Sequence, residues 1–468
     1  MIGLDRILTS LAGIILIPVL TKTLGAYGYG LWSQAIITIT LVLIVLILGF
    51  DLSIPRLFHA KEFEEIRKDF YSILTLVLVI SAVFSSLLFL FPEILANTIF
   101  GGYITIVKIV AIIIFISVLE KIFLTVFQAY REMKKYAFID ILSTLIETGL
   151  AITLVLLGYE IIGALIGVLF VRLFFSIALF FMVRKKLPFK KPNLSFIKEY
   201  LKLGIPTIPG GLSHFVVELS DRYVIGIFLG PAFVGYYVPG YSLGKIIPVL
   251  LGGLLAFVLL PTLSEFYEKK RIHTINNLLN LSTKYFLLIS IPSMVGMLIL
   301  GKSILLLFTT TEIAEAGYSI LILTAFVGIL YGLYEIYKVT IFLEKKTKLL
   351  TIYWVIGGVI NLVGNLIFVP KFGILAAGIT TLISYLLVTI MVLYFSFKNM
   401  PFRLDYLSIG KIVFSSILMG GSLYLVGPYL HNNLFLLIIL GILIYFASIY
   451  ILKGLDKKEI KFIKSLIS

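Results

Sequence analysis

Six charged residues lie in the middle of long apolar stretches, where a charge is costly and marks a functional candidate. Three are acids and three are bases: Glu147, Glu218, Asp221, Arg172, Arg222 and Lys245. Arginine can bind a phosphate or carboxylate through two parallel hydrogen bonds, and lysine binds it as a point charge. A buried carboxylate can carry a proton. The set therefore suits the binding of an anionic group, coupled to the movement of a proton.

The depth of these side chains follows from their distance to the predicted helix ends. Glu147, Arg172, Glu218 and Lys245 fall about 16–18 Å from the outer ends, close to the midplane of a roughly 30 Å hydrocarbon core. Asp221 and Arg222 lie one turn further out, and together the six would suit a water-filled central cavity. The alternative is purely structural pairing, since Glu218 and Arg222 are four residues apart and could neutralise each other.

Other polar residues within the apolar stretches have simpler explanations. Glu335 and Lys338 are spaced to pair along one helix face. Glu120, Lys121 and Lys284 are expected to extend toward the inner membrane interface. Asn361 and Asn365, one helical turn apart, are expected to form hydrogen bonds between helices rather than to bind a ligand.

The elements that must position these residues are membrane-spanning helices. The chain has 468 residues, of which 60% are hydrophobic and 13% are charged. Soluble domains are about half apolar and about a quarter charged, so a soluble globular protein is excluded. The chain has no cysteine, which excludes disulfides and thiolate metal sites. Its four histidines are scattered, so no catalytic residues and no metal site are expected.

A window of about 20 apolar residues predicts about fourteen spans. They cover roughly 4–24, 31–54, 70–91, 104–128, 138–158, 161–183, 201–228, 233–260, 280–300, 317–342, 350–370, 374–396, 409–427 and 433–452. The first lacks a small-residue cleavage site and is interpreted as a retained helix. Most lysines and arginines then fall in the connections on one side, and the other side carries only Lys22, Lys302 and Lys371. The positive-inside rule places both termini in the cytoplasm of a multi-pass plasma-membrane protein.

The net charge of +15 is thereby explained as an orientation signal, and no nucleic-acid partner is expected. The basic loops could also touch anionic headgroups, although topology alone accounts for them.

An internal repeat divides the chain into two similar halves. Leu24-Gly25 followed by Gly30 links spans 1 and 2, and Leu229-Gly230 followed by Gly235 links spans 7 and 8. Copies six spans apart share one orientation, which predicts pseudo-symmetric six-helix halves with the substrate between them. The predicted domains are residues 1–183, a basic cytoplasmic linker at 184–200, residues 201–396, and a final pair of helices with a cytoplasmic tail at 397–468.

Spans 7 and 8 carry helix-breaking residues as well as most of the buried charges. They contain Pro206, Pro209, Pro239 and Pro248, together with Gly210, Gly211, Gly240 and Gly244. Proline bends a helix, and a membrane helix tolerates it where protein or a water-filled cavity satisfies the backbone. This predicts a moving element that faces the substrate, and static kinks with small-residue packing are the alternative.

The two linker motifs, the segment Asp221-Arg222-Tyr223 and the later Gly235-Tyr236-Tyr237 resemble one family. It is the polysaccharide-transport (O-antigen flippase) branch of the multidrug/oligosaccharidyl-lipid/polysaccharide exporter superfamily, and the resemblance covers essentially the whole chain. It implies an all-α, V-shaped alternating-access transporter that moves a polyprenyl-linked oligosaccharide to the outer leaflet. Such proteins often couple transport to H⁺ or Na⁺, and no other cofactor is implied.

The resemblance also assigns residues. Asp221 and Arg222 match the family's pattern in span 7, and Asp51 and Arg56 match its usual end of span 2. Substrate binding is therefore expected at Arg172, Arg222, Lys245 and Arg56, with coupling or charge pairing at Glu147, Glu218, Asp221 and Asp51. Arg172 and Lys245 are included because of their depth rather than because of a motif.

Three other functions compete with this interpretation. A MATE-type drug/cation antiporter of the same superfamily usually has twelve spans, so the extra pair and the three buried bases count against it. A membrane glycosyltransferase or polymerase needs a sizeable extramembrane segment, which the short loops do not offer, so no enzyme is expected. A scaffold would leave the buried charges unexplained. The expected partners are the lipid-linked oligosaccharide, the bilayer and polysaccharide assembly proteins, and the protein itself is expected to be a monomer.

Overall fold

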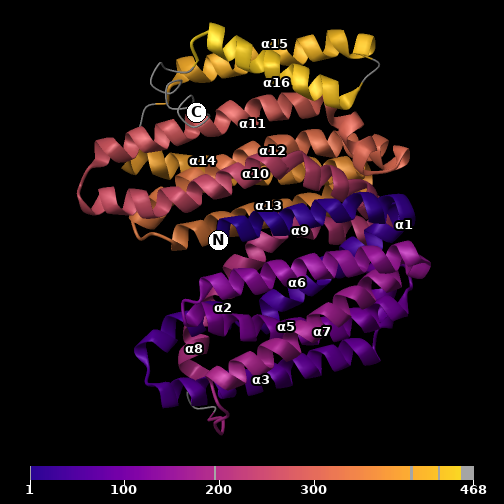
Figure 1. The fold of residues 1–468 in the computed structure, drawn as a ribbon, viewed down its shortest axis with the longest axis vertical. Coiled ribbons are helices and arrows are strands. Elements are labelled where there is room, and N and C mark those ends of the chain that lie inside the picture. The colour runs from indigo at the N-terminus through magenta and orange to yellow at the C-terminus, as the bar shows by residue number, and fades with distance from the viewer. Residues whose placement is uncertain (1, 194–196, 401–403, 431–432, 455–468) are drawn as a thin grey trace. The chain divides into compact units, whose positions relative to one another are not determined.

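The structure is a computed structural model that describes residues 2–193, 197–400, 404–430 and 433–454, with side chains described from residue 12 onward. Several predicted basic residues lie outside this part, namely Arg403 and the tail residues Lys457, Lys458, Lys461 and Lys464, and so does the side chain of Arg6. The described chain is helical throughout, which agrees with the all-α prediction (Figure 1).

The helices occur in the following order. They are α1 (Ile2–Leu46), α2 (Phe50–Leu57), α3 (Phe63–Leu90), α4 (Glu93–Ile99), α5 (Ile104–Ala129), α6 (Met133–Leu154), the π-helical turn η2 (Val155–Tyr159), α7 (Glu160–Lys186), α8 (Ile197–Gly204), α9 (Ile208–Phe228), α10 (Pro231–Glu268), α11 (Ile272–Phe308), α12 (Thr311–Leu343), α13 (Lys348–Phe372), α14 (Ile374–Asn399), α15 (Tyr406–Val426) and α16 (Leu434–Ile451), with short 3₁₀ turns η1 (Phe58–Ala60), η4 (Ile205–Thr207) and η5 (Gly427–Leu430).

Eleven helical runs among the described residues are long and apolar enough to cross a membrane. Two of them contain a break where the sequence predicts a connection between two spans. Gly25 has a positive φ of 66° inside the run that ends at Leu46, and Gly158 has a φ of 89° between α6 and α7. Glycine adopts this left-handed conformation without the steric cost that other residues have. The multi-pass membrane protein is thus supported, and the count of fourteen crossings stays a prediction.

The predicted second span, 31–54, is interrupted in the structure. α1 ends at Leu46, and α2 begins at Phe50 after a turn in which Leu48 and Gly49 both have positive φ. A Cβ at Gly49 would lie 2.3 Å from the carbonyl oxygen of Gly204 at the end of α8. This close backbone approach explains the interruption, because only glycine leaves room for it.

The chain divides into two compact units. The first contains residues 1–238 and 358–377, and the second contains residues 239–357 and 378–468. In the first unit, α5 packs against α3, α6 and α7 and also contacts α1 and α2. In the second unit, α11 packs against α12 and α15, and α15 packs against α16. The buried core of the last group includes Leu288, Met419 and Tyr445.

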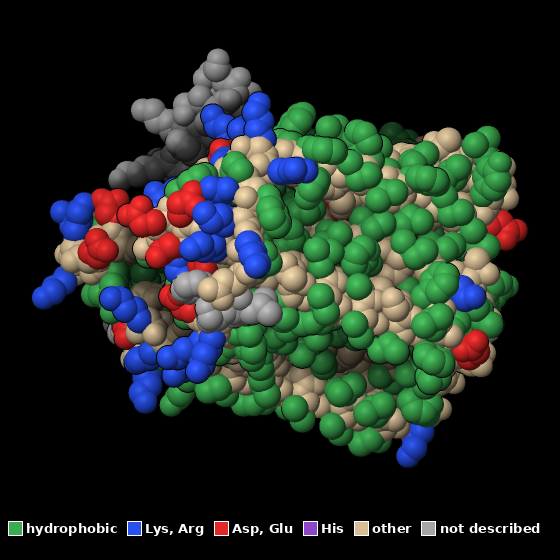
Figure 2. Space-filling view, turned by 90° about the horizontal axis from the view of Figure 1, so that it is seen from below, with side chains coloured by type: hydrophobic (Ala, Val, Ile, Leu, Met, Phe, Trp, Pro, Cys, Tyr) green, Lys and Arg blue, Asp and Glu red, His purple; other side chains and the backbone are tan. Residues whose placement is uncertain are grey.

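The surface shows the separation that a membrane protein requires. In Figure 2 the lysine, arginine, aspartate and glutamate side chains gather mainly at one end of the visible face, and hydrophobic side chains cover most of the remainder. Large exposed apolar residues such as Phe174, Phe181 and Leu443 are more than 60% exposed. A contiguous apolar surface of this kind is expected where the surrounding medium is lipid.

Candidate functional site

Arg172 forms an ion pair with Glu147 inside the first unit. Its Nε lies 3.0 Å from Glu147 Oε2, and its Nη1 donates to Ser117 Oγ at 2.6 Å. Arg172 comes from α7, Glu147 from α6 and Ser117 from α5, and these three helices pack together. Both charged side chains are about one-fifth exposed. The structure therefore joins two of the predicted residues in a polar centre where three helices meet.

Glu120 is an additional acid in this centre, although the sequence reasoning expected its side chain to extend toward the inner membrane interface. It is only 9% exposed, its Oε1 accepts a long hydrogen bond of 3.4 Å from Ser143, and it attracts Arg172 electrostatically. α5 has neighbours on several sides, so the Glu120 side chain has no short path to water. Lys284, also expected near the interface, is likewise buried, at 7% exposed. To predict that both side chains are buried, one would need to know which helices pack around them, and a single sequence does not supply this.

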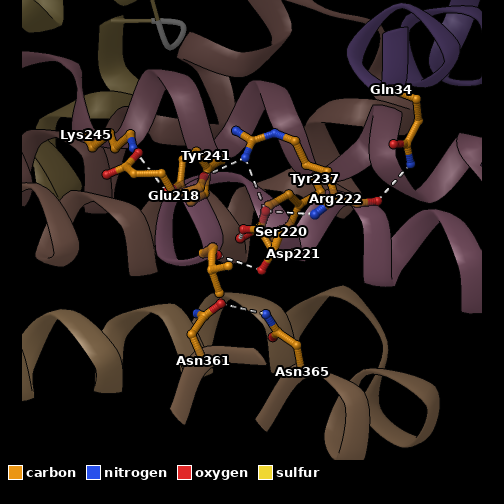
Figure 3. A network of polar contacts seen from close by, with 11 residues as sticks. Gln34, Glu218, Ser220, Asp221, Arg222, Tyr237, Tyr241, Lys245, Asn361 and Asn365 are labelled. Carbon is orange, nitrogen blue, oxygen red and sulfur yellow. Dashed lines mark hydrogen bonds and ion pairs between the residues drawn. The ribbon is translucent and has the colours of Figure 1, made fainter. Parts of the chain in front are cut away.

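Asp221 and Arg222 form a second polar centre on α9 (Figure 3). Asp221 is fully buried, and its Oδ2 accepts a 2.5 Å hydrogen bond from the hydroxyl of Tyr237. Its Oδ1 accepts from Arg222 Nη1 at 3.2 Å, and that nitrogen also donates to the backbone carbonyl of Glu218 at 2.7 Å. The carboxylate is thus held by charge-assisted bonds, which are the stronger kind.

Gln34 and Thr38 of α1 complete this centre, and motif reasoning selected neither of them. Gln34 on α1 donates through Nε2 to the carbonyl oxygen of Arg222 at 2.8 Å, and Tyr223 donates to Thr38 at 3.0 Å. Gln34 is fully buried. A buried glutamine within a predicted span was the available sequence signal, because a buried amide must find hydrogen-bond partners.

Asn361 and Asn365 on α13 belong to the polar network drawn in Figure 3. Both are fully buried, and Asn365 Nδ2 donates to Asn361 Oδ1 at 3.0 Å. α13 approaches α9 closely, since a Cβ at Gly358 would lie 3.4 Å from the carbonyl oxygen of Ser213. The Asn361–Asn365 hydrogen bond lies within α13, so the expected hydrogen bonds between helices stay a prediction.

Three further predicted residues come from other elements. Lys245 belongs to the second unit, where its Nζ donates to the hydroxyl of Tyr241 at 3.1 Å and lies 4.1 Å from the centre of that ring. Asp51 and Arg56 lie on the short helix α2, and Arg56 is exposed. The predicted residues therefore come from five helices, namely α2, α6, α7, α9 and α10.

The proline- and glycine-rich segment contains one helix break and one close contact between helices. Pro206 lies in the 3₁₀ turn η4, which separates α8 from α9. α10 remains one continuous helix across Pro239, Pro248 and Pro261. A Cβ at Gly240 would lie 2.4 Å from the carbonyl oxygen of Gly317, so this glycine allows α10 to pack closely on α12. Small-residue packing thus accounts for Gly240.

A family model described as "Polysaccharide biosynthesis protein" matches residues 19–317, which is more than half of the chain. The chain belongs to this family. The matched region contains the polar centre around Arg172, the one around Asp221 and Arg222, and the Lys245–Tyr241 pair. It ends before Asn361 and Asn365. The interpretation drawn from the linker motifs and the Asp221-Arg222-Tyr223 segment is confirmed at this level.

Curated relatives of this polysaccharide biosynthesis protein are described as flippases. The chain is 26% identical over 260 residues to the probable low-salt glycan biosynthesis flippase Agl15 of Haloferax volcanii, covering 55% of each chain. It is 27% identical over 245 residues to the probable lipid II flippase MurJ of Vibrio cholerae, covering 51% of this chain and 44% of that one. The matches span about half the length of these relatives.

Solved structures agree on the fold. The lipid II flippase MurJ in an inward closed conformation matches with a TM-score of 0.81 at 21% identity and covers 99% of both chains. An inward-facing MATE-family multidrug transporter of the MOP superfamily matches with a TM-score of 0.65 at 15% identity, covering 85% of this chain and 94% of that one. The fold is that of this transporter superfamily.

Proposed function

We propose that this protein is a flippase that moves a polyprenyl-linked oligosaccharide from the cytoplasmic to the outer leaflet by alternating access. The observation that carries the proposal is the pair of buried polar centres, which hold Arg172 and Arg222 inside an otherwise apolar helical unit. Membership in the polysaccharide biosynthesis family and the flippase relatives support the substrate class. As a transporter, the protein is not expected to alter its substrate chemically.

The two arginines have suitable chemistry for an anionic lipid headgroup. A guanidinium binds phosphate oxygens through parallel hydrogen bonds and stays charged at every physiological pH. In the resting arrangement Arg172 is held by Glu147 and Arg222 by Asp221, so the substrate phosphate would replace a carboxylate rather than meet an unpaired charge. This exchange avoids an isolated buried cation, which would have a large desolvation penalty. Lys245 is proposed to bind a further anionic group of the glycan, and Arg56 to contact the substrate at the surface.

The displaced carboxylates provide a route to ion coupling. When a substrate phosphate binds the guanidinium, Glu147 or Asp221 loses its counter-charge. The ionised form of that buried carboxylate is then destabilised. Uptake of a proton or binding of Na⁺ removes that cost, so occupancy by substrate and by ion become linked. Glu218 and Asp51 are the other acids assigned to coupling.

The polyprenyl chain needs an apolar path, and the second unit offers one. A cavity of about 370 Å³ is lined by apolar side chains of α10, α11, α15 and α16, among them Ile247, Met297, Leu423 and Ile442. Each buried methylene contributes about 0.8 kcal/mol, so a long isoprenoid would gain substantially from this surface. We propose that the lipid tail occupies it while the sugar crosses.

The deciding experiment follows the substrate in cells and in vesicles. Deletion of the gene should cause a lipid-linked oligosaccharide to accumulate on the cytoplasmic leaflet, where added glycosidase reaches it only after the cells are opened. Purified protein in liposomes should expose a labelled lipid-linked oligosaccharide to an external lectin, and Arg172→Gln with Arg222→Gln should abolish this. Normal export after deletion, together with drug efflux that depends on the protein, would instead identify a MATE-type antiporter.

A further inference from the structure

A groove between α3 and α8 lies outside every site described so far. Its volume is about 680 Å³. Apolar side chains form most of its wall, and two lysines lie at its border: Leu76, Ile197, Leu201, Ile205, Pro206, Lys198 and Lys202. α8 begins in the predicted basic linker at 184–200, whose lysines and arginines were assigned to the cytoplasmic side, and continues into the start of the predicted seventh span.

The spacing along α8 gives the groove two chemically different sides. Ile197 and Leu201 are four residues apart and therefore lie along one face of α8, and Ile205 follows in the turn η4. Lys198 and Lys202 are also four residues apart, and each follows one of those apolar residues directly. The helix thus presents an apolar stripe with a parallel row of two exposed ammonium groups beside it.

Contacts on its other side fix α8 in place. Tyr200 is fully buried and donates its hydroxyl to Asp69 Oδ2 at 2.9 Å. Lys61 Nζ lies 2.7 Å from Asp69 Oδ2 and 2.7 Å from Glu199 Oε2. The end of α8 also rests closely on the turn at Gly49. The groove therefore has a rigid wall rather than a loosely attached one.

The charges around the groove are unbalanced. Two acids on or against α8, Asp69 and Glu199, are both engaged by Lys61. Across the portions of the chain that the structure describes, no ion pair or hydrogen bond joins Lys198 or Lys202 to another residue. Two ammonium groups one turn apart thus border the apolar groove, and no acid among the described residues pairs with them.

We propose that this groove binds an anionic phospholipid of the inner leaflet. Its phosphate lies between the ammonium groups of Lys198 and Lys202, and an acyl chain follows Leu76, Leu201 and Ile205. Charge complementarity selects this occupant, because the cytoplasmic leaflet carries a negative surface potential that attracts basic residues at the interface. The apolar wall requires a ligand with a hydrocarbon chain, which a soluble anion lacks.

Lipid retention tests the proposal independently of transport. The full-length protein, purified in detergent and stripped of lipid, is titrated with phosphatidylglycerol or with phosphatidylcholine of the same acyl chains, and bound lipid is counted by native mass spectrometry. Wild type should prefer phosphatidylglycerol. Lys198→Gln with Lys202→Gln should weaken its binding about 30-fold, because each basic side chain near an anionic lipid surface contributes about 1 kcal/mol.

The matched control is Lys345→Gln with Lys348→Gln, which removes the same charge from an exposed basic loop of the second unit. This pair should retain the wild-type preference, and each single groove variant should lose about five-fold. Equal losses in both double variants, or no preference between the two lipids, would overturn the proposal. Tighter binding of a polyprenyl phosphate that displaces phosphatidylglycerol would assign the groove to the substrate instead.

Discussion

Arg172 shows at the scale of one residue how binding and structure compete. Its guanidinium is shared between Glu147 and Ser117, so in this conformation it stabilises the helix packing. A substrate phosphate would have to replace the carboxylate. The sequence left two interpretations open, a binding cavity and structural pairing, and a mutation cycle at this residue can separate them.

Replacing Arg172 should destabilise the protein more than removing both partners of the pair. Arg172→Gln leaves Glu147 without its cation, and breaking a buried pair in this way costs roughly 3–5 kcal/mol. The double variant Arg172→Gln with Glu147→Gln should recover most of that loss, because neither charge is then stranded. Thermal unfolding in detergent measures both variants.

The flipping assay then separates structure from binding. A double variant that is stable but inactive would show that Arg172 serves the substrate. Full activity in the stable double variant would leave the pair a purely structural role.

Tyr237 should be needed to hold Asp221 in place. Its hydroxyl donates to a fully buried carboxylate, and hydrogen bonds to charged groups contribute about 1.5–3 kcal/mol. Tyr237→Phe should therefore lower stability by about that amount in chemical unfolding. Tyr159→Phe is the control, since Tyr159 is 63% exposed. An equal, small effect of both changes would contradict the assigned role.

At the scale of elements, the two copies of the repeated linker pack against each other reciprocally. A Cβ at Gly30 would lie 1.8 Å from the carbonyl oxygen of Pro231, and a Cβ at Gly235 would lie 1.9 Å from that of Ala26. Gly30 and Gly235 occupy equivalent positions of the repeat, as do Ala26 and Pro231. The repeated motif thus encodes a contact that needs glycine on both sides.

Adding a methyl group at either position should open this junction. Gly30→Ala or Gly235→Ala forces the backbones apart, at a cost of about 1–3 kcal/mol for overpacking. The control is Gly13→Ala, because a Cβ there meets nothing within 4 Å and alanine favours the helix. Thermal unfolding and the flipping assay should both separate the variants from the control. Wild-type behaviour of Gly30→Ala would contradict the close packing.

Lys61 should hold α8 and the linker before it against α3. Burial lowers the pKa of its ammonium, but hydrogen bonds to Asp69 and Glu199 raise it more, so the pKa lies above the usual lysine value. A raised folded-state pKa gives stability that is complete below about pH 10.4 and is lost as pH rises through the folded value. Proteolysis of the linker should therefore be equally slow from pH 6 to pH 9.

The variant Lys61→Gln should accelerate cleavage of the linker at every pH in that range, because it removes both ion pairs. Lys68→Gln serves as the control, since it removes a neighbouring positive charge of α3 and leaves this contact intact. Equal cleavage rates in the two variants would show that Lys61 does not hold the linker.

The sequence predicted the elements better than their contacts. Apolar periodicity located most helices, and the Leu-Gly motifs marked the break at Gly25 in α1. The interruption after Leu46 was missed, because it depends on the approach of Gly49 to Gly204, which is far away in the chain. Likewise Arg172 and Glu147 could be chosen as buried charges, but Ser117 and Glu120 became visible only when helix packing placed them beside those charges. Gln34 became visible only through its contact with the backbone of Arg222.

At the scale of the whole molecule, the number of crossings and their direction determine every proposed role. α6, η2 and α7 form one helical run from Met133 to Lys186, and this run is long enough to cross a membrane twice. Gly158, with its positive φ, divides the run where the sequence predicts an outer turn. The basic residues at both ends of the run would then face the cytoplasm, as the positive-inside rule requires.

Cysteine labelling can decide whether this helical run crosses the membrane once or twice, because the chain has no cysteine of its own. Single substitutions Arg131→Cys, Tyr159→Cys and Lys185→Cys place one thiol before the run, one near its middle and one at its end. Tyr159→Cys should react with a membrane-impermeant maleimide in intact cells, since Tyr159 is well exposed, while the other two should react only after permeabilisation. Labelling of Lys185→Cys from outside would mean a single crossing, and would reverse the orientation of every later helix and with it the proposed direction of transport.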